Sequence, residues 1–150
     1  MAIRNVVQEG DEVLRQKCAL VENFDAELHN LLDDMRDTLK DAQGAGLAAP
    51  QVGVLRRIVV IETPEEGLFE LINPKIIAFA GEQRSEEGCL SIPGRWGSTR
   101  RPRHVTVQVM NRKGETFEIS GSDLLARAFC HELDHLDGKL FIDCVIEEVE

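Results

Sequence analysis

Apolar residues recur at helical spacing in the first third of the chain. From Phe24 onward they return every three or four residues, at Leu28, Leu31, Leu32, Met35 and Leu39. This period places them on one face of an α-helix. Asn23 or Asp25 can cap the start of that helix, and Gly44 lies just past its end. We therefore predict one amphipathic helix between Phe24 and Gly44.

The middle of the chain changes to short apolar runs separated by turn residues. Such runs predict β-strands, and five are expected: Arg57–Glu62, Phe69–Ile72, Lys75–Phe79, Val105–Met110 and Thr116–Ile119. The last two flank Lys113-Gly114, which predicts a hairpin turn. A further short strand is expected at Lys139–Val145.

A second helix is predicted over Ser122–Asp137, beginning at Ser122 or Asp123 and stopping near Gly138. Strands gathered between two long helices favour an α+β fold over a βαβ repeat. A chain of 150 residues is most simply one domain, spanning residues 1–150.

Composition narrows the classes of partner. The chain has 27 acidic and 17 basic residues and a formal charge of −10, which argues against non-specific binding to nucleic acid or anionic lipid. No secretory signal or membrane-length apolar stretch is apparent, and the four cysteines form no CxxC pair. We expect a soluble, reduced, cytoplasmic protein with no membrane partner.

Two charged segments have simple interpretations. Arg95, Arg100, Arg101 and Arg103 lie close together, and we expect a loop of solvated arginines rather than a patch for an acidic partner. The acidic end, Glu147–Glu150, is expected to be a solvated tail.

The strongest chemical pattern is His131-Glu132-Leu133-Asp134-His135. Residues four apart share a helix face, so His131 and His135 can hold one metal ion together. Glu132 projects roughly 100° round the helix from His131 and can reach a water at the metal without being a ligand. Leu124 and Ala128 continue the histidine stripe, either as an apolar pocket wall beside the metal or simply as core.

A catalytic site of this kind usually has a third protein ligand. No histidine follows His135, and the glutamates beyond it (Glu147, Glu148 and Glu150) lie past a predicted strand. Upstream, Cys89 follows a glycine in Glu87-Gly88-Cys89-Leu90-Ser91, and a thiolate would complete a Cys-His-His set. A lone cysteine is more often a buried apolar residue, but the histidine pair favours a ligand at Cys89.

The segment Gly44–Gln51 is rich in small residues and contains Pro50. Gly44 and Gly46 permit close backbone approach, and the Gln51 amide can donate to a developing oxyanion. A tight turn packed against the helix is the alternative interpretation.

These three elements, in this order, resemble the peptide deformylase family, which is marked by GxGLAAxQ, EGCLS and HExxH followed by DHLxG. The matching segments are Gly44–Gln51, Glu87–Ser91 and His131–Gly138. The resemblance covers nearly the whole chain. It implies a mixed or antiparallel sheet packed around a central metal-binding helix.

The resemblance also implies roles for matching residues. Cys89, His131 and His135 would hold the metal, normally Fe²⁺ in bacterial members, with Zn²⁺, Ni²⁺ or Co²⁺ able to replace it. A metal-bound water would attack the formyl group of an N-formylmethionyl peptide, releasing formate, with Glu132 as general base and then acid.

Further implied roles concern the substrate. Gln51 and the Leu90 N–H would bind the formyl oxygen, and the Gly46 backbone would pair with the peptide. Leu124, Ala128 and His131 would line the pocket for the methionine side chain. Glu87 would form an orienting ion pair, with Arg101 as partner.

Three departures from the family pattern stand out. Cys130 replaces a common glutamine and is expected in the core, because its phase turns it away from the metal stripe. Trp96 stands near the substrate entrance where the family has an arginine. Many bacterial members also dock on the ribosome through a basic C-terminal helix; the ribosome is thus a candidate partner, but the acidic end here argues against that route.

Two other functions remain open from the residues alone. A zincin-type endopeptidase would use the same helix with a downstream ligand. A non-catalytic metal-binding relative would hold the ion without turnover, although Glu132 and Gln51 are both present.

Overall fold

The strand β2 (Ile58–Thr63) lies between the two long helices, which explains its unbroken apolar run. In the computed structural model, which describes residues 2–149, Ile58 and Val60 pack in the cluster of α1 (Ala26–Ala42). Val59 and Ile61 pack in the cluster of α2 (Leu124–His135). Successive strand side chains point to opposite faces. A strand covered on both faces therefore has apolar residues at successive positions, here Ile58 to Ile61.

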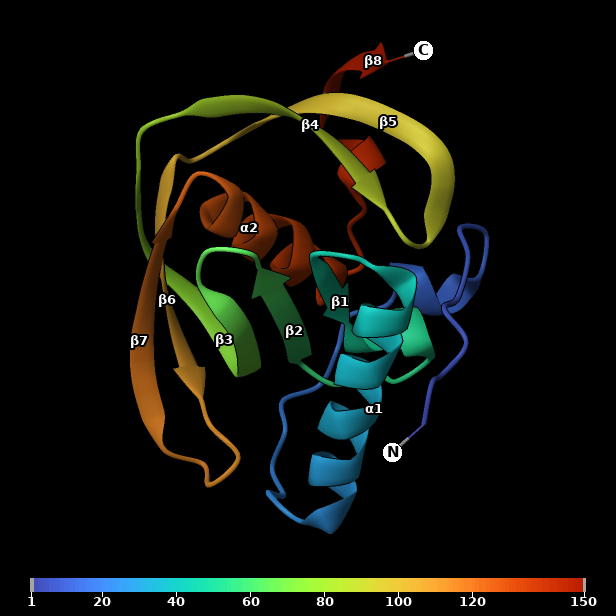
Figure 1. Cartoon of the computed structure of the whole chain (residues 1–150), viewed down its shortest axis with the longest axis vertical. Coiled ribbons are helices and arrows are strands. Elements are labelled where there is room, and N and C mark those ends of the chain that lie inside the picture. Colours follow the sequence, from blue (N-terminus) through green and yellow to red (C-terminus); the bar gives the residue numbers. More distant parts are fainter. Residues whose placement is uncertain (1, 150) are drawn as a thin grey trace.

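Two antiparallel sheets enclose α2 (Figure 1). The larger has the order β1-β2-β3-β6-β7, and the smaller has the order β4-β5-β8. The remaining strands are β1 (Gly46–Ala48), β3 (Gly67–Ala80), β4 (Gln83–Cys89), β5 (Ile92–Arg101), β6 (His104–Met110), β7 (Thr116–Ser122) and β8 (Val145–Val149). Short 3₁₀ helices occur at η1 (Glu12–Arg15), η2 (Ala49–Val52) and η3 (Phe141–Asp143). The α+β prediction with a central helix is confirmed.

The first helix matches its prediction closely. Asp25 is the N-cap, and its side chain accepts a hydrogen bond from the Leu28 N–H at 3.1 Å. Gln43 ends the helix in the left-handed conformation at φ 55°. The chain then turns directly into β1, a short strand that the small-residue segment Gly44–Gln51 did not predict.

The predicted strands Phe69–Ile72 and Lys75–Phe79 are one strand, β3, with a register shift between Ile72 and Lys75. Asn73 adopts φ 51° at the shift. Its side chain accepts from the Val21 N–H at 2.8 Å and donates to the Val21 carbonyl at 3.0 Å. These bonds hold the bend, so the strand continues past Asn73-Pro74.

The prediction of a solvated arginine loop is wrong. Arg95, Arg100 and Arg101 belong to β5, which pairs with β4 as a hairpin. Arg95 and Arg100 are exposed, but Arg101 is buried. The hairpin is rich in polar residues and so lacks the apolar alternation that predicts strands.

The C-terminal predictions also need correction. Residues 141–143 form η3 rather than a strand, because Asp143 accepts a hydrogen bond from the Leu140 N–H at 3.0 Å and closes the turn. The expected solvated tail instead forms part of β8, which pairs with β5. Glu150 lies outside the described residues.

The second helix is shorter than predicted at both ends. Ser122 belongs to β7, paired with His104, so it cannot cap the helix. Asp123 makes the turn at φ 53° and ψ −115° without a capping bond from its side chain, and His135 is the last helical residue. Among residues 2–149, no helix is long and apolar enough to cross a membrane.

Candidate metal centre and active site

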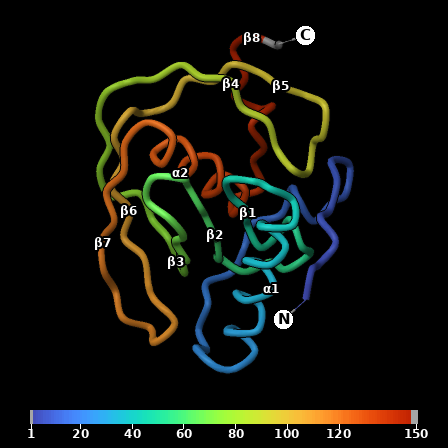
Figure 2. Tube along the Cα trace, in the orientation of Figure 1, coloured from blue at the N-terminus to red at the C-terminus, as the bar shows by residue number. Residues whose placement is uncertain are grey.

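Helix α2 delivers two imidazoles and one carboxylate to the middle of the molecule. His131, Glu132 and His135 are all buried. The His131 Nδ1 lies 2.8 Å from Glu87 Oε1, which directs its Nε2 the other way. The trace in Figure 2 shows this helix between the β4–β5 hairpin and the larger sheet.

Cys89 joins the histidines from the end of β4. Its Sγ lies 3.5 Å from His135 Nε2. One possible ligand atom from each of Cys89, His131 and His135 lies within 4.8 Å of the others. Three such atoms around one point fit a four-coordinate ion with one open position. The structure therefore brings together the three residues expected to bind metal.

Electrostatics at this point favour a cation. Burial lowers the pKa of His135 to about 3, so the imidazole is neutral, as a metal ligand must be. Burial also disfavours the charged form of His131, but Glu132, Cys89 and Glu87 outweigh it and raise its pKa. These groups favour a positive charge at His131, which a divalent ion held by the donor set would supply in place of the proton.

Glu132 is buried beside these donors without joining them. Its Oε2 lies 4.0 Å from His131 Nε2, and its Oε1 has no hydrogen-bond partner within residues 2–149. Burial raises the pKa of Glu132 to about 7. A carboxyl group with that pKa can both accept and return a proton near neutral pH.

Gly46 on β1 makes room for this carboxylate. A Cβ atom at Gly46 would lie 2.5 Å from Glu132 Oε2. Only glycine permits such an approach. The strand backbone therefore lies directly against the buried acid.

The Gln51 side chain is held at both ends. Its Oε1 accepts from the Ala48 N–H at 2.9 Å. Its Nε2 donates to Ser91 Oγ at 3.1 Å and lies 3.5 Å from Cys89 Sγ. The amide N–H groups are thus held beside Cys89. Sequence reasoning assigned no role to Ser91, which is buried and two residues after Cys89; its position inside the matching motif was the available signal.

A buried ion-pair network supports His131 from behind. Arg101 Nε and Nη2 each lie 3.0 Å from a Glu87 oxygen, and Arg101 Nη1 lies 2.8 Å from Asp134 Oδ2. The expected Glu87–Arg101 pair is present. Sequence reasoning missed Asp134 as the second partner, although Asp134 lies within the histidine motif.

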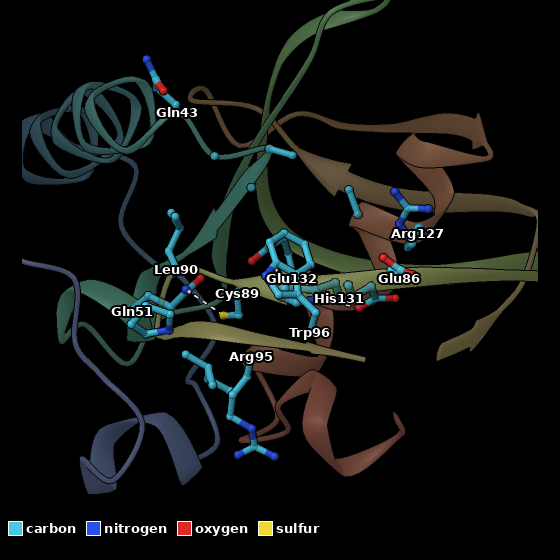
Figure 3. Close-up of a pocket in the computed structure, with 18 of the residues that line it drawn as sticks. Gln43, Gln51, Glu86, Cys89, Leu90, Arg95, Trp96, Arg127, His131 and Glu132 are labelled. Carbon is cyan, nitrogen blue, oxygen red and sulfur yellow. Dashed lines mark hydrogen bonds and ion pairs between the residues drawn. The ribbon is translucent and has the colours of Figure 1, made fainter. Parts of the chain in front are cut away.

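A cavity of about 420 Å³ opens beside the donors. Its lining includes Gly46 and Leu90 and, from α2, Leu124, Ala128 and His131. Ala128 also packs in the core, whereas Leu124 is 38% exposed. In Figure 3 Gln51, Cys89, His131 and Glu132 gather in the middle of the view, and Gln43 extends away from them. The residues proposed for catalysis and substrate binding thus border one cavity, and Cys130 lies in the core as expected.

The polypeptide deformylase family model matches residues 3–150 of this chain. The chain belongs to the polypeptide deformylase family. The peptide deformylase of Alkaliphilus metalliredigens is 52% identical and aligns with 99% of this chain and 100% of its own length. That of Thermoanaerobacter pseudethanolicus is 54% identical, with 97% and 91% covered. Deformylases are metal-dependent hydrolases of the N-formyl group of newly made polypeptides, and membership assigns this activity to the chain.

Solved deformylase structures have the same fold. A crystal structure of the Legionella pneumophila peptide deformylase superposes with a TM-score of 0.92 at 45% identity, covering 96% of this chain and 86% of that one. The Ehrlichia chaffeensis deformylase in complex with actinonin gives 0.94 at 37% identity, with 97% and 90% covered. The sequence-based prediction of a deformylase fold is therefore confirmed.

Proposed function

We propose that Glu132, Gln51 and Leu90 carry out deformylation beside a divalent ion held by Cys89, His131 and His135. One observation supports this most directly. Three donor atoms lie within 4.8 Å of one another, and the buried Glu132 carboxylate and the anchored Gln51 amide border the same cavity. This arrangement unites a set of metal ligands, a proton carrier and an oxyanion donor at one point.

The proposed resident ion is Fe²⁺, with Zn²⁺, Ni²⁺ or Co²⁺ able to replace it. A Cys-His-His set suits borderline and soft divalent ions. When bound, the ion supplies Lewis acidity and lowers the pKa of water. The hydrogen bond between His131 Nδ1 and Glu87 leaves His131 Nε2 for the ion.

Glu132 moves the proton during the reaction. With a pKa of about 7, its carboxylate accepts a proton from the attacking water. The water oxygen bonds to the formyl carbon, and Glu132 returns the proton to the amine nitrogen as the C–N bond breaks. The products are formate and a peptide with a free N-terminal methionine.

Gln51 stabilises the negative charge that forms on the formyl oxygen. Its Nε2 is held beside Cys89 by Ser91, and Leu90 follows Cys89 at the same turn. We assign the second donor to the Leu90 N–H. Loss of one such donor typically costs about 10²–10³ in rate.

The peptide binds along β1. This strand ends the larger sheet, so among the described strands it pairs only with β2 and leaves its other edge free. An extended peptide can add to such an edge through the Gly46 backbone. Its methionine side chain then packs in the cavity against the wall formed by Leu124, Ala128 and His131.

We place this activity in the cytoplasm, on formylmethionyl chains made there. The net charge of −10 argues against nucleic acid as a direct partner. Residues 145–149 form a strand and include Glu147 and Glu148, so this segment itself is not a basic docking helix.

The decisive experiment measures formate release from formyl-Met-Ala-Ser by metal-loaded protein. We expect turnover in the wild type and its loss in Glu132→Ala, with the metal content of the variant unchanged. Glu118→Ala on the outer strand β7 is the matched control and retains activity. Absence of formate release from the metal-loaded wild type would contradict the proposal.

The same preparations distinguish the alternatives. Internal peptide-bond cleavage that survives Cys89→Ala would indicate a zincin-type endopeptidase. Bound metal without any turnover would indicate a non-catalytic relative.

Anaerobic purification with metal analysis tests the identity of the ion. The iron form should lose activity in air while the nickel and zinc forms keep theirs, and equal air stability of all forms would argue against iron.

A further inference from the structure

Trp96 is an exposed aromatic side chain at the mouth of the catalytic cavity. Its exposed fraction is 54%, and its ring lines the cavity together with Leu90 and Leu124. Of the large apolar side chains exposed within residues 2–149, only Trp96 and Leu124 line this cavity. Leu124 has a proposed role in holding methionine, whereas Trp96 has none. Tryptophan is among the residue types most enriched where side chains dominate the binding energy of an interface.

The indole is held in place by its own sheet. Trp96 lies on β5, and its six-membered ring covers Gly88 on the paired strand β4. A Cβ atom at Gly88 would lie 2.8 Å from the Trp96 ring, so the absence of a side chain at Gly88 leaves room for the indole. Trp96, Glu132 and His131 all line the cavity, and Figure 3 draws them together with Arg95, whose side chain extends away from them. The ring therefore forms part of the rim of the cavity.

The substrate residues that follow methionine reach this rim when the peptide is bound in extended form. If methionine occupies the apolar wall, the next two residues of an extended peptide reach roughly 7 Å further, at about 3.3 Å per residue. Charge offers little selection there, because the lining contains both Glu86 and Arg127, and Arg95 pairs with Glu9 at 3.6 Å. The indole is then the group best able to discriminate between side chains.

We propose that Trp96 is a specificity-determining residue that selects substrates with a large apolar or aromatic side chain at one of the two positions after formyl-methionine. This inference rests on the proposed function. The contact forms when the peptide binds and persists through the reaction, so it acts on KM rather than kcat.

The first test compares formate release from formyl-Met-Ser-Ser, formyl-Met-Phe-Ser and formyl-Met-Ser-Phe. In the wild type, one phenylalanine peptide should exceed the serine peptide by about three- to tenfold in kcat/KM, mainly through KM. Trp96→Ala and Trp96→Arg should reduce that ratio to below about twofold, whereas Trp96→Phe should retain most of it. Phe79→Ala, which removes an exposed aromatic ring outside the cavity, is the matched control and keeps the wild-type ratio.

A second readout uses the fact that Trp96 is the only tryptophan of the chain, which also lacks tyrosine. Product peptides carrying the preferred phenylalanine should shift its emission to shorter wavelength at saturation, whereas Met-Ser-Ser should not. An unchanged emission overturns the inference. So does a phenylalanine preference that is absent in the wild type or equal in wild type and Trp96→Arg. Those results leave the proposed function intact, which fails only if no formylated peptide is turned over.

Discussion

Glu87 is a buried carboxylate that links the candidate metal centre to the rest of the fold. It accepts hydrogen bonds from Thr99 Oγ1, from Arg101 and from His131 Nδ1. Burial by itself would raise the pKa of Glu87, but His131 and Arg101 hold it at about 2. The carboxylate is therefore charged throughout the neutral range and orients the His131 ring through that charge.

Replacement of this single residue should be costly. Glu87→Gln leaves the buried Arg101 with only Asp134, a partly exposed partner, as its counter-charge. Breaking a buried pair from one side typically costs about 3–5 kcal/mol. We expect a loss of that order in the free energy of unfolding at pH 7, measured by urea denaturation. Glu82→Gln, which breaks the exposed pair with Arg100, is the matched control and should change little.

The pH dependence follows from the lowered pKa of Glu87. A carboxylate with a folded pKa below its unfolded value stabilises the protein above the unfolded pKa, here near 4.5. That contribution is lost as the pH falls from about 4.5 toward about 2. The difference in unfolding free energy between wild type and Glu87→Gln should therefore shrink over this range. A difference in unfolding free energy that stays constant down to about pH 2 would contradict the assignment of this pH dependence to Glu87.

At the scale of secondary structure, β1 and α2 approach each other closely in the site. Gly46 and Glu132 belong to these two elements, and the absent Cβ is what lets them meet. Gly44, in the turn before β1, has a related contact: a Cβ there would lie 2.9 Å from the end of the Leu90 side chain. An added methyl group would therefore displace Glu132 or the strand at Gly46, but the end of the Leu90 side chain at Gly44.

We expect Gly46→Ala to reduce kcat/KM for formyl-Met-Ala-Ser strongly. The new methyl group must displace either the strand or the Glu132 carboxylate, and a shift of about 1 Å in a reacting group can cost about 10²-fold. Gly44→Ala is the comparison, because the terminal atoms of Leu90 can rotate away, and its loss should be smaller. Equal losses in the two variants, with unchanged thermal stability, would argue against a specific effect on Glu132.

At the scale of the whole molecule, the metal ligands connect two separate parts. Cys89 belongs to the smaller sheet, and the histidines belong to the helix that packs on the larger sheet. An ion bound between them would tie these parts together in the folded state only. Ligands that bind only the folded state stabilise it, by about 2.7 kcal/mol at a hundredfold excess over Kd.

Removal of the metal should therefore lower the melting temperature. We expect a fall of several degrees on chelation and its reversal by added Zn²⁺ or Fe²⁺, measured by circular dichroism. Cys89→Ala should show little of this metal-dependent shift. Cys130→Ala, at a buried cysteine outside the donor set, should retain it. A shift of the same size in both variants would contradict the assignment of Cys89 as a ligand.

Local sequence patterns predicted the parts of this protein that depend on local periodicity. The helix that begins after Asp25 and the apolar strand β2 follow from spacing alone, because each buries a regular face. The β4–β5 hairpin was missed, since its residues are mostly polar and one of its strands, β5, also pairs with β8, which is distant in sequence. The arginines were misread for the same reason: Arg101 is buried only because Glu87 and Asp134 meet it in the folded chain.

The sequence by itself determined the family and the residues that border the site, because helical spacing and short motifs are properties of neighbouring positions. Only the tertiary structure decided how these residues meet. It brought Cys89 to the histidines, held Gln51 against Ser91, placed Gly46 against Glu132 and seated Trp96 over Gly88. The first three of these contacts join segments that are remote along the chain, and the fourth joins the two strands of one hairpin. They depend on strand register and helix packing, which the whole fold sets together and no local pattern encodes.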